Sequence, residues 1–268
     1  MCLLVLAWQA HPRYRLVVAA NRDEFHERRA APLHEWSAAP GGLGGGVPGI
    51  LGGRDLRAGG TWLALDRSRR FGVVTNYRDL QQPAPGAPSR GRLIPDYLTQ
   101  TGGAREFLAA LAPAAEQYSG FNLLLTDDDG LWYASNRATP FARALPPGVY
   151  GLSNHLLDTP WPKLQRARRA FQTWLDASPV PGADGLLALL GDRTPAEAHE
   201  RLPETGLSPE WERVLSSTFV LHPQYGTRCS TVVMLEPGGA ILVRERRYDA
   251  AGAVSGETEV ELRRDEWR

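Results

Sequence analysis

An unbroken apolar run at the N-terminus, Leu3 to Trp8, constrains the fold more than any other feature of the sequence. Both alternating faces of this run are apolar, and a strand of that kind has to be covered on both sides. A polar break at His11 to Arg13 separates it from a second apolar run, Leu16 to Ala20, which we predict to be its hairpin partner. The second run stops abruptly at Asn21-Arg22-Asp23-Glu24. We therefore expect the chain to begin with a buried hairpin.

The other expected elements fall into groups along the chain. Apolar runs predict strands at 61–65, 71–75, 121–126, 131–134, 149–152, 219–221, 231–235, 240–243 and 257–262. Helical spacing predicts helices at 93–100, 104–111, 161–175, 183–190 and 195–201, whereas residues 21–60 are expected to form a loop region rich in Gly and Pro. Strands come in hairpins at both ends and most helices lie between them. This order favours an α+β fold in which two antiparallel sheets pack together with helices outside. No linker is visible, so residues 1–268 are predicted to form a single domain.

Composition excludes several classes of function. Thirty basic residues balance thirty acidic residues, so no global field would hold a polyanion, and we expect no nucleic-acid partner. The two cysteines, Cys2 and Cys229, are too few for a disulfide framework and predict a reducing compartment. The N-terminal apolar run is too short for a signal peptide, and no stretch approaches the roughly 18 apolar residues of a membrane span. We therefore expect a cytoplasmic protein without integral membrane association.

Cys2 is the first candidate for chemistry. Removal of Met1, which aminopeptidases perform before a small residue, leaves its thiol and a free α-amine on one residue. An α-amine with a pKa of about 7.7–8.0 can accept the thiol proton near neutral pH, so no separate histidine is needed. Taken alone, Cys2 is interpreted as a small residue of a buried strand, and the nucleophile is the alternative.

The tetrapeptide after the second apolar run supplies the next candidates. Strand alternation gives Asn21 and Asp23 one face, and it gives Arg22 and Glu24 the other. Hairpin pairing would bring one of these sets beside Cys2, and we expect it to be the set containing Asp23, whose carboxylate could orient the amine. An ordinary ion pair at the strand edge is the alternative interpretation of Asp23.

Three more polar residues lie at the ends of apolar runs. Asn76 and Asn154 each end such a run, and an amide NH2 group is a suitable donor to an oxyanion. Arg228 precedes the run that starts at Cys229, and a guanidinium can hold a carboxylate or steady a thiolate. Ordinary turn chemistry remains the alternative interpretation of the two asparagines.

No motif predicts a resident cofactor or metal. The glycine-rich stretch 41–46 lacks the Gly-Lys-Ser/Thr ending of a phosphate loop. The six histidines include no i, i+4 pair and no cysteine at metal-ligand spacing. His26 and His34 are kept as candidate ligands of haem iron.

Sequence blocks give a resemblance to a known family. Met1-Cys2 followed by Asn21-Arg22-Asp23-Glu24 resembles the NRDE family, which is named for that tetrapeptide and includes the transport-and-Golgi-organisation proteins. The resemblance implies a link to haem trafficking and to the handling of lipids or acyl-CoA. Further blocks match in order along almost the whole chain: Gly52-Gly53-Arg54-Asp55, Gly59-Gly60-Thr61-Trp62-Leu63, Thr75-Asn76-Tyr77-Arg78, Ser89-Arg90-Gly91, Gly120-Phe121-Asn122-Leu123, Ser135-Asn136-Arg137, Gly151-Leu152-Ser153-Asn154, Thr159-Pro160-Trp161-Pro162-Lys163 and Tyr225-Gly226-Thr227-Arg228-Cys229-Ser230-Thr231.

The chain is also similar, more distantly, to the N-terminal-nucleophile hydrolases of the choloylglycine and penicillin V acylase type. That resemblance implies a four-layer αββα sandwich of two antiparallel sheets. It further implies that Cys2 is the nucleophile, Asp23 the partner of its amine, Asn76 and Asn154 the oxyanion donors, and Arg228 the arginine that supports the thiol. One departure from the pattern stands at Ala20, where those hydrolases carry an arginine; this chain has Arg22 between Asn21 and Asp23 instead.

Two functions from different classes are therefore expected. The first is a cysteine amidohydrolase that acts, without a cofactor, on a linear amide bond of a small acylated substrate. The second is a non-catalytic trafficking protein that binds haem, acyl-CoA or a lipid in the same cleft. Composition does not separate the two.

Overall fold

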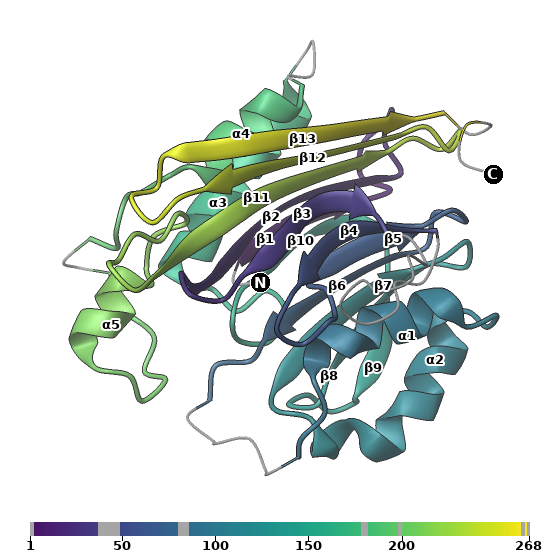
Figure 1. Cartoon of the computed structure of the whole chain (residues 1–268), viewed down its shortest axis with the longest axis horizontal. Helices are drawn as coiled ribbons and strands as arrows, with labels where there is room; N and C mark the ends of the chain where they lie inside the picture. Colours follow the sequence, from purple (N-terminus) through teal and green to yellow (C-terminus); the bar gives the residue numbers. More distant parts are fainter. Residues whose placement is uncertain are drawn as a thin grey trace. The chain divides into compact units, whose positions relative to one another are not determined.

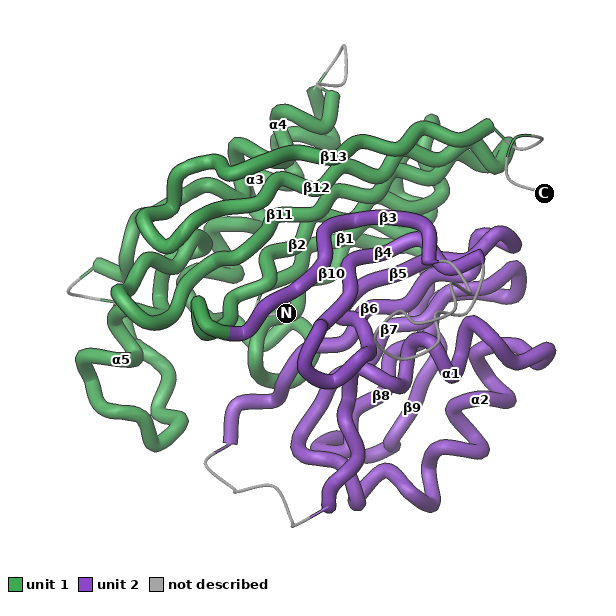
Figure 2. Tube along the Cα trace, viewed as in Figure 1, with its two compact units in different colours: residues 1–27, 147–267 green, residues 28–146, 268 purple. Residues whose placement is uncertain are grey.

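The computed structural model describes residues 3–36, 49–79, 86–177, 182–197, 200–263 and 266. The chain folds into two compact units, which Figure 2 shows in green and purple. Unit 1 comprises residues 1–27 and 147–267, and unit 2 comprises residues 28–146 with residue 268. Cys2 and the glycine-rich stretch 41–46 lie outside the described residues.

Unit 1 is built on a six-stranded antiparallel sheet with the order β10-β1-β2-β11-β12-β13 (Figure 1). The predicted N-terminal hairpin is confirmed, because β1 pairs with β2 from Leu3 opposite Asn21 to Trp8 opposite Leu16. The strands are β1 (Leu3–Trp8), β2 (Leu16–Phe25), β10 (Gly148–Leu152), β11 (Tyr225–Leu235), β12 (Ile241–Tyr248) and β13 (Val254–Leu262).

Two helices cover one face of this sheet. Helix α3 (Pro162–Asp176) packs on β1 and β10, and α4 (Ala183–Leu190) packs on β2 and β11. Their apolar stripes meet the odd-numbered residues of β1, so that Leu3, Val5 and Phe171 are fully buried. The even-numbered residues of β1 are buried as well, which confirms that this strand is covered on both faces. A third helix, α5 (Pro209–Val214), is capped by the Ser208 side chain, which accepts from the backbone N–H of Trp211.

Strand β2 extends further than its apolar run predicts. It continues through Asn21-Arg22-Asp23-Glu24 to Phe25 and stays paired with β11 over this length. Polar residues are tolerated in a buried strand when their side chains find hydrogen-bond partners. Partners on β11 therefore explain why the strand does not end at Ala20.

Unit 2 is built on a seven-stranded antiparallel meander in which each strand pairs with the next along the chain. Helix α1 (Leu93–Thr99) packs on β5 and β6, and α2 (Ala104–Leu111) approaches β8. Two short 3-10 helices, Arg90–Arg92 and Ala112–Gln117, flank this helical pair. The strands are β3 (Ala30–Glu35), β4 (Ile50–Asp55), β5 (Leu63–Asp66), β6 (Phe71–Asn76), β7 (Phe121–Thr126), β8 (Leu131–Ser135) and β9 (Ala142–Leu145).

Strands β3 and β4 correct the prediction of a loop over residues 21–60. Glycine suggests a loop in sequence, yet Gly52 and Gly53 belong to β4. A Cβ atom on Gly52 would lie 2.7 Å from the Leu63 carbonyl oxygen, and one on Gly53 would overlap the Trp62 ring. These glycines therefore serve close packing inside a sheet rather than a turn.

Other local predictions also need correction. Residues 195–197, expected to begin a helix, are not helical, and the backbone N–H of Ala196 donates to the Ser216 hydroxyl instead. Residues 219–221, expected to form a strand, contribute a single bridge between Leu221 and Gly226. The coarse expectation holds: the protein has two antiparallel sheets with a few helices, an α+β layered architecture.

Candidate functional site

Most of the polar residues singled out in the sequence lie at one end of the unit 1 sheet. Strand β1 begins there, with Leu3 opposite Asn21, and β10 ends there, with Leu152 opposite Leu4. Strand β11 begins at the same end, because its Thr227 lies opposite Asp23. We call this group the polar end; its members are Asn21, Arg22, Asp23, Glu24, Asn154, Thr227 and Arg228.

Asn21 is a buried cross-link. Its side-chain Nδ2 donates to the carbonyl oxygens of Leu190 and Thr218, each at 2.9 Å. Its Oδ1 accepts from the Ser230 hydroxyl at 2.6 Å, and Ser230 in turn accepts from the Tyr248 hydroxyl. Leu190 ends α4, so the Asn21 amide satisfies a carbonyl that the helix itself leaves open. Both N–H donors are therefore used for structure.

Asp23 is held by Thr227. The Thr227 hydroxyl donates to Asp23 Oδ1 at 2.8 Å and accepts the backbone N–H of Val220 at 2.9 Å. Because the Val220 N–H occupies the acceptor side of this hydroxyl, its proton is directed at the carboxylate. Asp23 itself is only 4% exposed. The carboxylate is thus fixed in place before any ligand binds.

Arg22 and Glu24 occupy the other face of β2. Their side chains approach each other at 3.9 Å, between Arg22 Nη2 and Glu24 Oε2. Arg22 is 4% exposed and lies opposite Cys229 in the pairing with β11. The alternation predicted for the tetrapeptide therefore holds within β2. Which of the two faces Cys2 shares stays a prediction, since Cys2 lies outside the described residues.

Arg228 is positioned by a bulge and a histidine. The register of β2 with β11 shifts between Thr227 and Cys229, which leaves Arg228 as the extra residue. Its guanidinium Nη1 donates to His26 Nδ1 at 2.9 Å, while His26 Nε2 lies 2.9 Å from the carbonyl oxygen of His222. One neutral tautomer satisfies both contacts, with Nε2–H donating and Nδ1 accepting. Both ring nitrogens of His26 are therefore engaged.

Asn154 lies in the turn that follows β10 and is 5% exposed. The turn is closed by a reciprocal pair: the Gly151 N–H donates to the Asp158 carboxylate, and the Asp158 N–H donates to the Gly151 carbonyl, each at 2.8 Å. Arg168 of α3 also contacts this carboxylate at 3.0 Å. The backbone around Asn154 is thus tied to the end of β10 and to α3.

Asn76 lies in the other unit. It ends β6 of unit 2, where it pairs with Phe121, and its side chain is exposed. Its predicted partnership with Asn154 stays a prediction from the resemblance.

The second cysteine, Cys229, is an unreactive thiol. Cys229 is 5% exposed, and burial together with the charge of Glu245 raises the pKa of its thiol. A thiol of this kind stays protonated and is a poor nucleophile at neutral pH.

Sequence reasoning missed two residues of this region. Thr227 lies in a block quoted for the family resemblance. Its position opposite Asp23 lets its hydroxyl hold the Asp23 carboxylate, and nothing in the neighbouring sequence indicates this role. Glu245 is 2% exposed in β12 opposite Thr231, and it approaches Arg247 at 3.7 Å. In sequence it belongs to a charged run that suggests a solvated strand. No sequence signal could have identified its burial.

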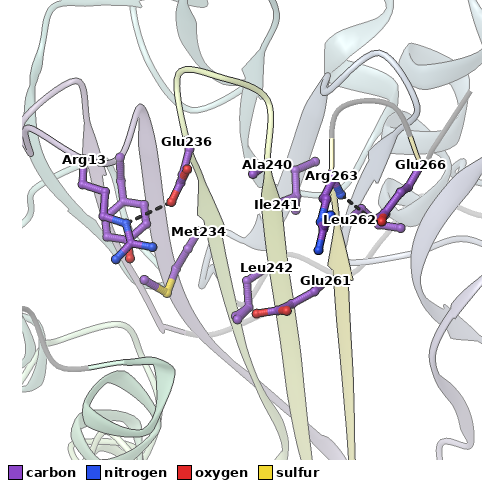
Figure 3. Close-up of a pocket in the computed structure, with 11 residues that line it drawn as sticks. Arg13, Met234, Glu236, Ala240, Ile241, Leu242, Glu261, Leu262, Arg263 and Glu266 are labelled. Carbon is purple, nitrogen blue, oxygen red and sulfur yellow. Dashed lines mark hydrogen bonds and ion pairs between the residues drawn. The ribbon is translucent and has the colours of Figure 1, made fainter.

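A separate cavity of about 410 Å³ lies at the opposite end of the same sheet (Figure 3). It is bordered by the ion pairs Arg13–Glu236, at 2.9 Å, and Arg263–Glu266, at 3.7 Å. Met234 and Leu242 point into the space between these pairs. Of the described residues that were predicted to carry chemistry, none lines it.

The described part of the chain contains neither a metal-binding cluster nor a membrane-spanning helix. Among those residues, no group of three or more His, Cys, Asp or Glu side chains could hold a metal ion. None of the helices formed by the described residues is long and apolar enough to cross a membrane.

The polar end offers a defined set of chemical groups. It contains an oriented carboxylate, a guanidinium on a fixed histidine and a buried amide, all within one unit. Such groups can hold an ammonium, bind an anion and stabilise an oxyanion, respectively.

Comparison with known proteins agrees with the sequence blocks. A family model described as Transport and Golgi organisation 2 matches residues 1–250. The Transport and Golgi organization 2 homolog of Mus musculus is 31% identical over 265 residues, covering 92% of each chain. The Homo sapiens homolog is 32% identical over 265 residues with the same coverage, and the Drosophila melanogaster protein is 28% identical over 261 residues, covering 88% of each chain. The chain belongs to the Transport and Golgi organisation 2 family, the NRDE family that its sequence blocks indicate.

Proposed function

We propose that this protein is an N-terminal cysteine amidohydrolase that cleaves a linear amide bond of a small acylated substrate. The observation that carries the proposal is the fixed Asp23 carboxylate at the sheet end where β1 begins. The proposal includes the four-layer αββα arrangement of the N-terminal-nucleophile hydrolases. It applies to the mature chain, from which Met1 has been removed.

The nucleophile is the Cys2 thiol. One peptide unit joins Cys2 to Leu3, and consecutive Cα atoms are about 3.8 Å apart. Leu3 is fully buried and lies opposite Asn21, two residues from Asp23. This covalent tether supports a mature α-amine within reach of the polar end. The amine, with a pKa near 7.7–8.0, then serves as the base for the thiol.

Asp23 holds that amine in place. A carboxylate with a donated Thr227 hydroxyl at one oxygen has its second oxygen oriented as well, because the carboxyl group is planar. An ammonium formed after proton transfer is stabilised by this negative charge. Thr227 is thus a positioning residue in the proposal, and Asp23 is the group that contacts the reacting amine.

The remaining polar residues stabilise charge. Asn154 supplies an amide N–H to the oxyanion, and Asn76 is the second donor implied by the family resemblance. Arg228, fixed by His26, supports the thiolate. Asn21 takes no part in the chemistry, because its two N–H donors are bound to carbonyl groups.

The proposed reaction has two steps. The Cys2 sulfur bonds to the amide carbonyl carbon while the thiol proton moves to the α-amine. The C–N bond then breaks as that proton passes to the leaving nitrogen, which gives a free amine and a thioester on Cys2. In the second step, water attacks the thioester with the α-amine as base, which releases a carboxylic acid and restores the thiol.

Three measurements test the proposal together. Intact mass spectrometry should find Met1 removed, and iodoacetamide at pH 7.5 should modify Cys2 before Cys229. A panel of N-acyl amides should be hydrolysed by the wild-type protein. Cys2→Ser and Cys2→Ala should lose turnover while keeping substrate affinity, and Cys229→Ala, the matched control, should keep both. Retained Met1 with preferential labelling of Cys229 would overturn the proposal.

The Asp23→Ala variant tests the role of the carboxylate. It should slow the alkylation of Cys2 strongly while lowering the urea midpoint only slightly, because the lost charge acts on the amine. Equal Cys2 alkylation rates in wild type and Asp23→Ala would contradict this role.

A non-catalytic haem carrier is the second candidate function. One observation favours His34 as the residue that would bind the haem iron. His34 Nδ1 donates to the Pro32 carbonyl at 2.6 Å, which leaves Nε2 as the lone-pair nitrogen that binds iron. His26 is unsuitable, because both its nitrogens are engaged. The relatives are named for transport and Golgi organization, which supports a transport role for this chain. Absorbance titration with haem should then show saturable binding that His34→Ala abolishes and His26→Ala retains, without amide turnover.

A further inference from the structure

A second cavity of unit 1 lies beside the polar end but is separate from it. The segment 217–221 divides the two. Its backbone groups at Thr218 and Val220 hydrogen-bond to Asn21 and Thr227 of the polar end. The side chains of Phe219 and Leu221 line the cavity instead. The cavity is therefore no continuation of the candidate catalytic site.

The cavity has a ligand-sized apolar interior. Its volume is about 400 Å³, toward the lower end of the roughly 300–1,000 Å³ typical of small-molecule pockets. The buried Phe219 ring and Val214 lie among its lining, and Pro195 and Leu221 contribute further apolar surface. Leu221 is 47% exposed, which is a high exposure for a leucine that lines a concave surface.

The lining also carries two arginines. The Arg193 guanidinium lies over the Phe219 ring, 4.7 Å from its centroid, and its Nη2 donates to the Gly252 carbonyl at 2.7 Å. Arg213, in the last turn of α5, has no hydrogen bond or ion pair from its guanidinium to any residue that the structure describes. Among the described residues that line the cavity, Glu210 is the one acidic side chain, so their net charge is positive.

The uncharged polar groups of the lining are already bonded. The Ser217 hydroxyl donates to the Phe219 carbonyl at 2.7 Å. The Arg213 carbonyl accepts from the N–H and the hydroxyl of Ser216. What remains for a ligand is apolar surface with guanidinium N–H donors beside it, which is the complement of a carboxylate on a compact apolar body.

We propose that this cavity binds a small apolar carboxylate, with the carboxylate at Arg213 and Arg193 and the apolar body against Phe219, Val214 and Leu221. A monoanion matches the one positive charge in excess at the lining. Arg213 provides the main recognition, because forming the ion pair breaks no hydrogen bond or ion pair between its guanidinium and a described residue. The site holds whether or not the protein hydrolyses amides.

Isothermal calorimetry with 3-phenylpropionate tests the proposal. The wild-type protein should bind one equivalent, and Arg213→Gln should weaken binding about tenfold, as expected for the loss of a charge-assisted hydrogen bond. Leu221→Asp, which places a negative charge in the lining, should abolish binding. Arg201→Gln is the matched control, because Arg201 is exposed, pairs with Glu204 and does not line the cavity. It should bind within twofold of the wild type.

A neutral analogue and a second protein background complete the test. The alcohol 3-phenylpropan-1-ol should bind at least tenfold more weakly than the carboxylate if charge recognition operates. Cys2→Ala should bind 3-phenylpropionate like the wild type, which separates this site from the proposed catalytic one. The proposal is overturned if the wild type fails to bind, if the alcohol binds equally well, or if Arg213→Gln behaves like Arg201→Gln.

Discussion

Replacement of Asn21 by alanine should destabilise unit 1 more than replacement of any other residue of the tetrapeptide by alanine. Asn21 is fully buried, and its amide joins three parts of the unit. It donates to Leu190 at the end of α4 and to Thr218, and it accepts from Ser230 of β11. Alanine removes all three hydrogen bonds and adds no new partner.

The magnitude follows from the groups left behind. A buried polar group that loses its partner costs about 1–3 kcal/mol. The Leu190 and Thr218 carbonyls each lose a donor, and Ser230 keeps the contact from Tyr248. Counting about 1–1.5 kcal/mol for each carbonyl and less for Ser230, we expect a loss of about 3 kcal/mol. This corresponds to a fall in Tm of about 6–12 °C.

Urea unfolding followed by circular dichroism measures the effect directly. Asn76→Ala is the matched control, because it makes the same substitution at an exposed position and should cost less than about 0.5 kcal/mol. Asn21→Asp gives a second test. At pH 7 its carboxylate faces two carbonyl oxygens that need donors, so it should be less stable than the alanine variant.

Two results would refute this account of Asn21. A loss below about 1 kcal/mol in Asn21→Ala would mean that water replaces the lost donors. An Asn21→Asp variant at least as stable as Asn21→Ala would mean that the carbonyl contacts do not exist in solution.

Three further predictions concern single groups. Burial raises the pKa of the Cys229 thiol, so the stability of the wild type should fall as pH rises above the unfolded thiol pKa of about 8.5. Between pH 8 and 10.5, the urea midpoint of Cys229→Ala should therefore fall less steeply than that of the wild type. Burial of Asp55 opposes its ionisation, but backbone N–H groups and a guanidinium outweigh burial and lower its pKa. Asp55→Asn should therefore be less stable than the wild type at pH 7, and in the same assay the difference should shrink as pH falls below the unfolded carboxyl pKa of about 3.9. Thr227→Val removes the hydroxyl that Asp23 accepts from, so it should lose about 1–2 kcal/mol by urea unfolding and Thr227→Ser should restore most of that loss; equal midpoints for the two variants would contradict this.

The buried strands and helices of the core could be predicted from sequence because burial requires a regular local pattern of apolar residues. The apolar run Leu3 to Trp8 and the helical spacing of 161–175 each predicted an element that the structure contains. Strand β3 escaped prediction because it is mostly exposed, and β4 escaped because Gly52 and Gly53 look like loop residues. The residues that require glycine there are Trp62, just before β5, and Leu63 of β5, so the sequence around Gly52 and Gly53 does not reveal the requirement.

The candidate site divides along the same line. By itself, the sequence determined the family, the N-terminal hairpin and the alternation of Asn21 and Asp23 with Arg22 and Glu24, because each depends on residue identity or on the two-residue period of a strand. Only the tertiary structure decided that Thr227 hydrogen-bonds to Asp23 and that the Asn21 amide donates to the last residue of α4. The first contact joins residues about two hundred positions apart in the sequence, and the second joins residues about one hundred and seventy positions apart. Register between distant strands sets such contacts, and register depends on how whole elements pack rather than on any local run of residues.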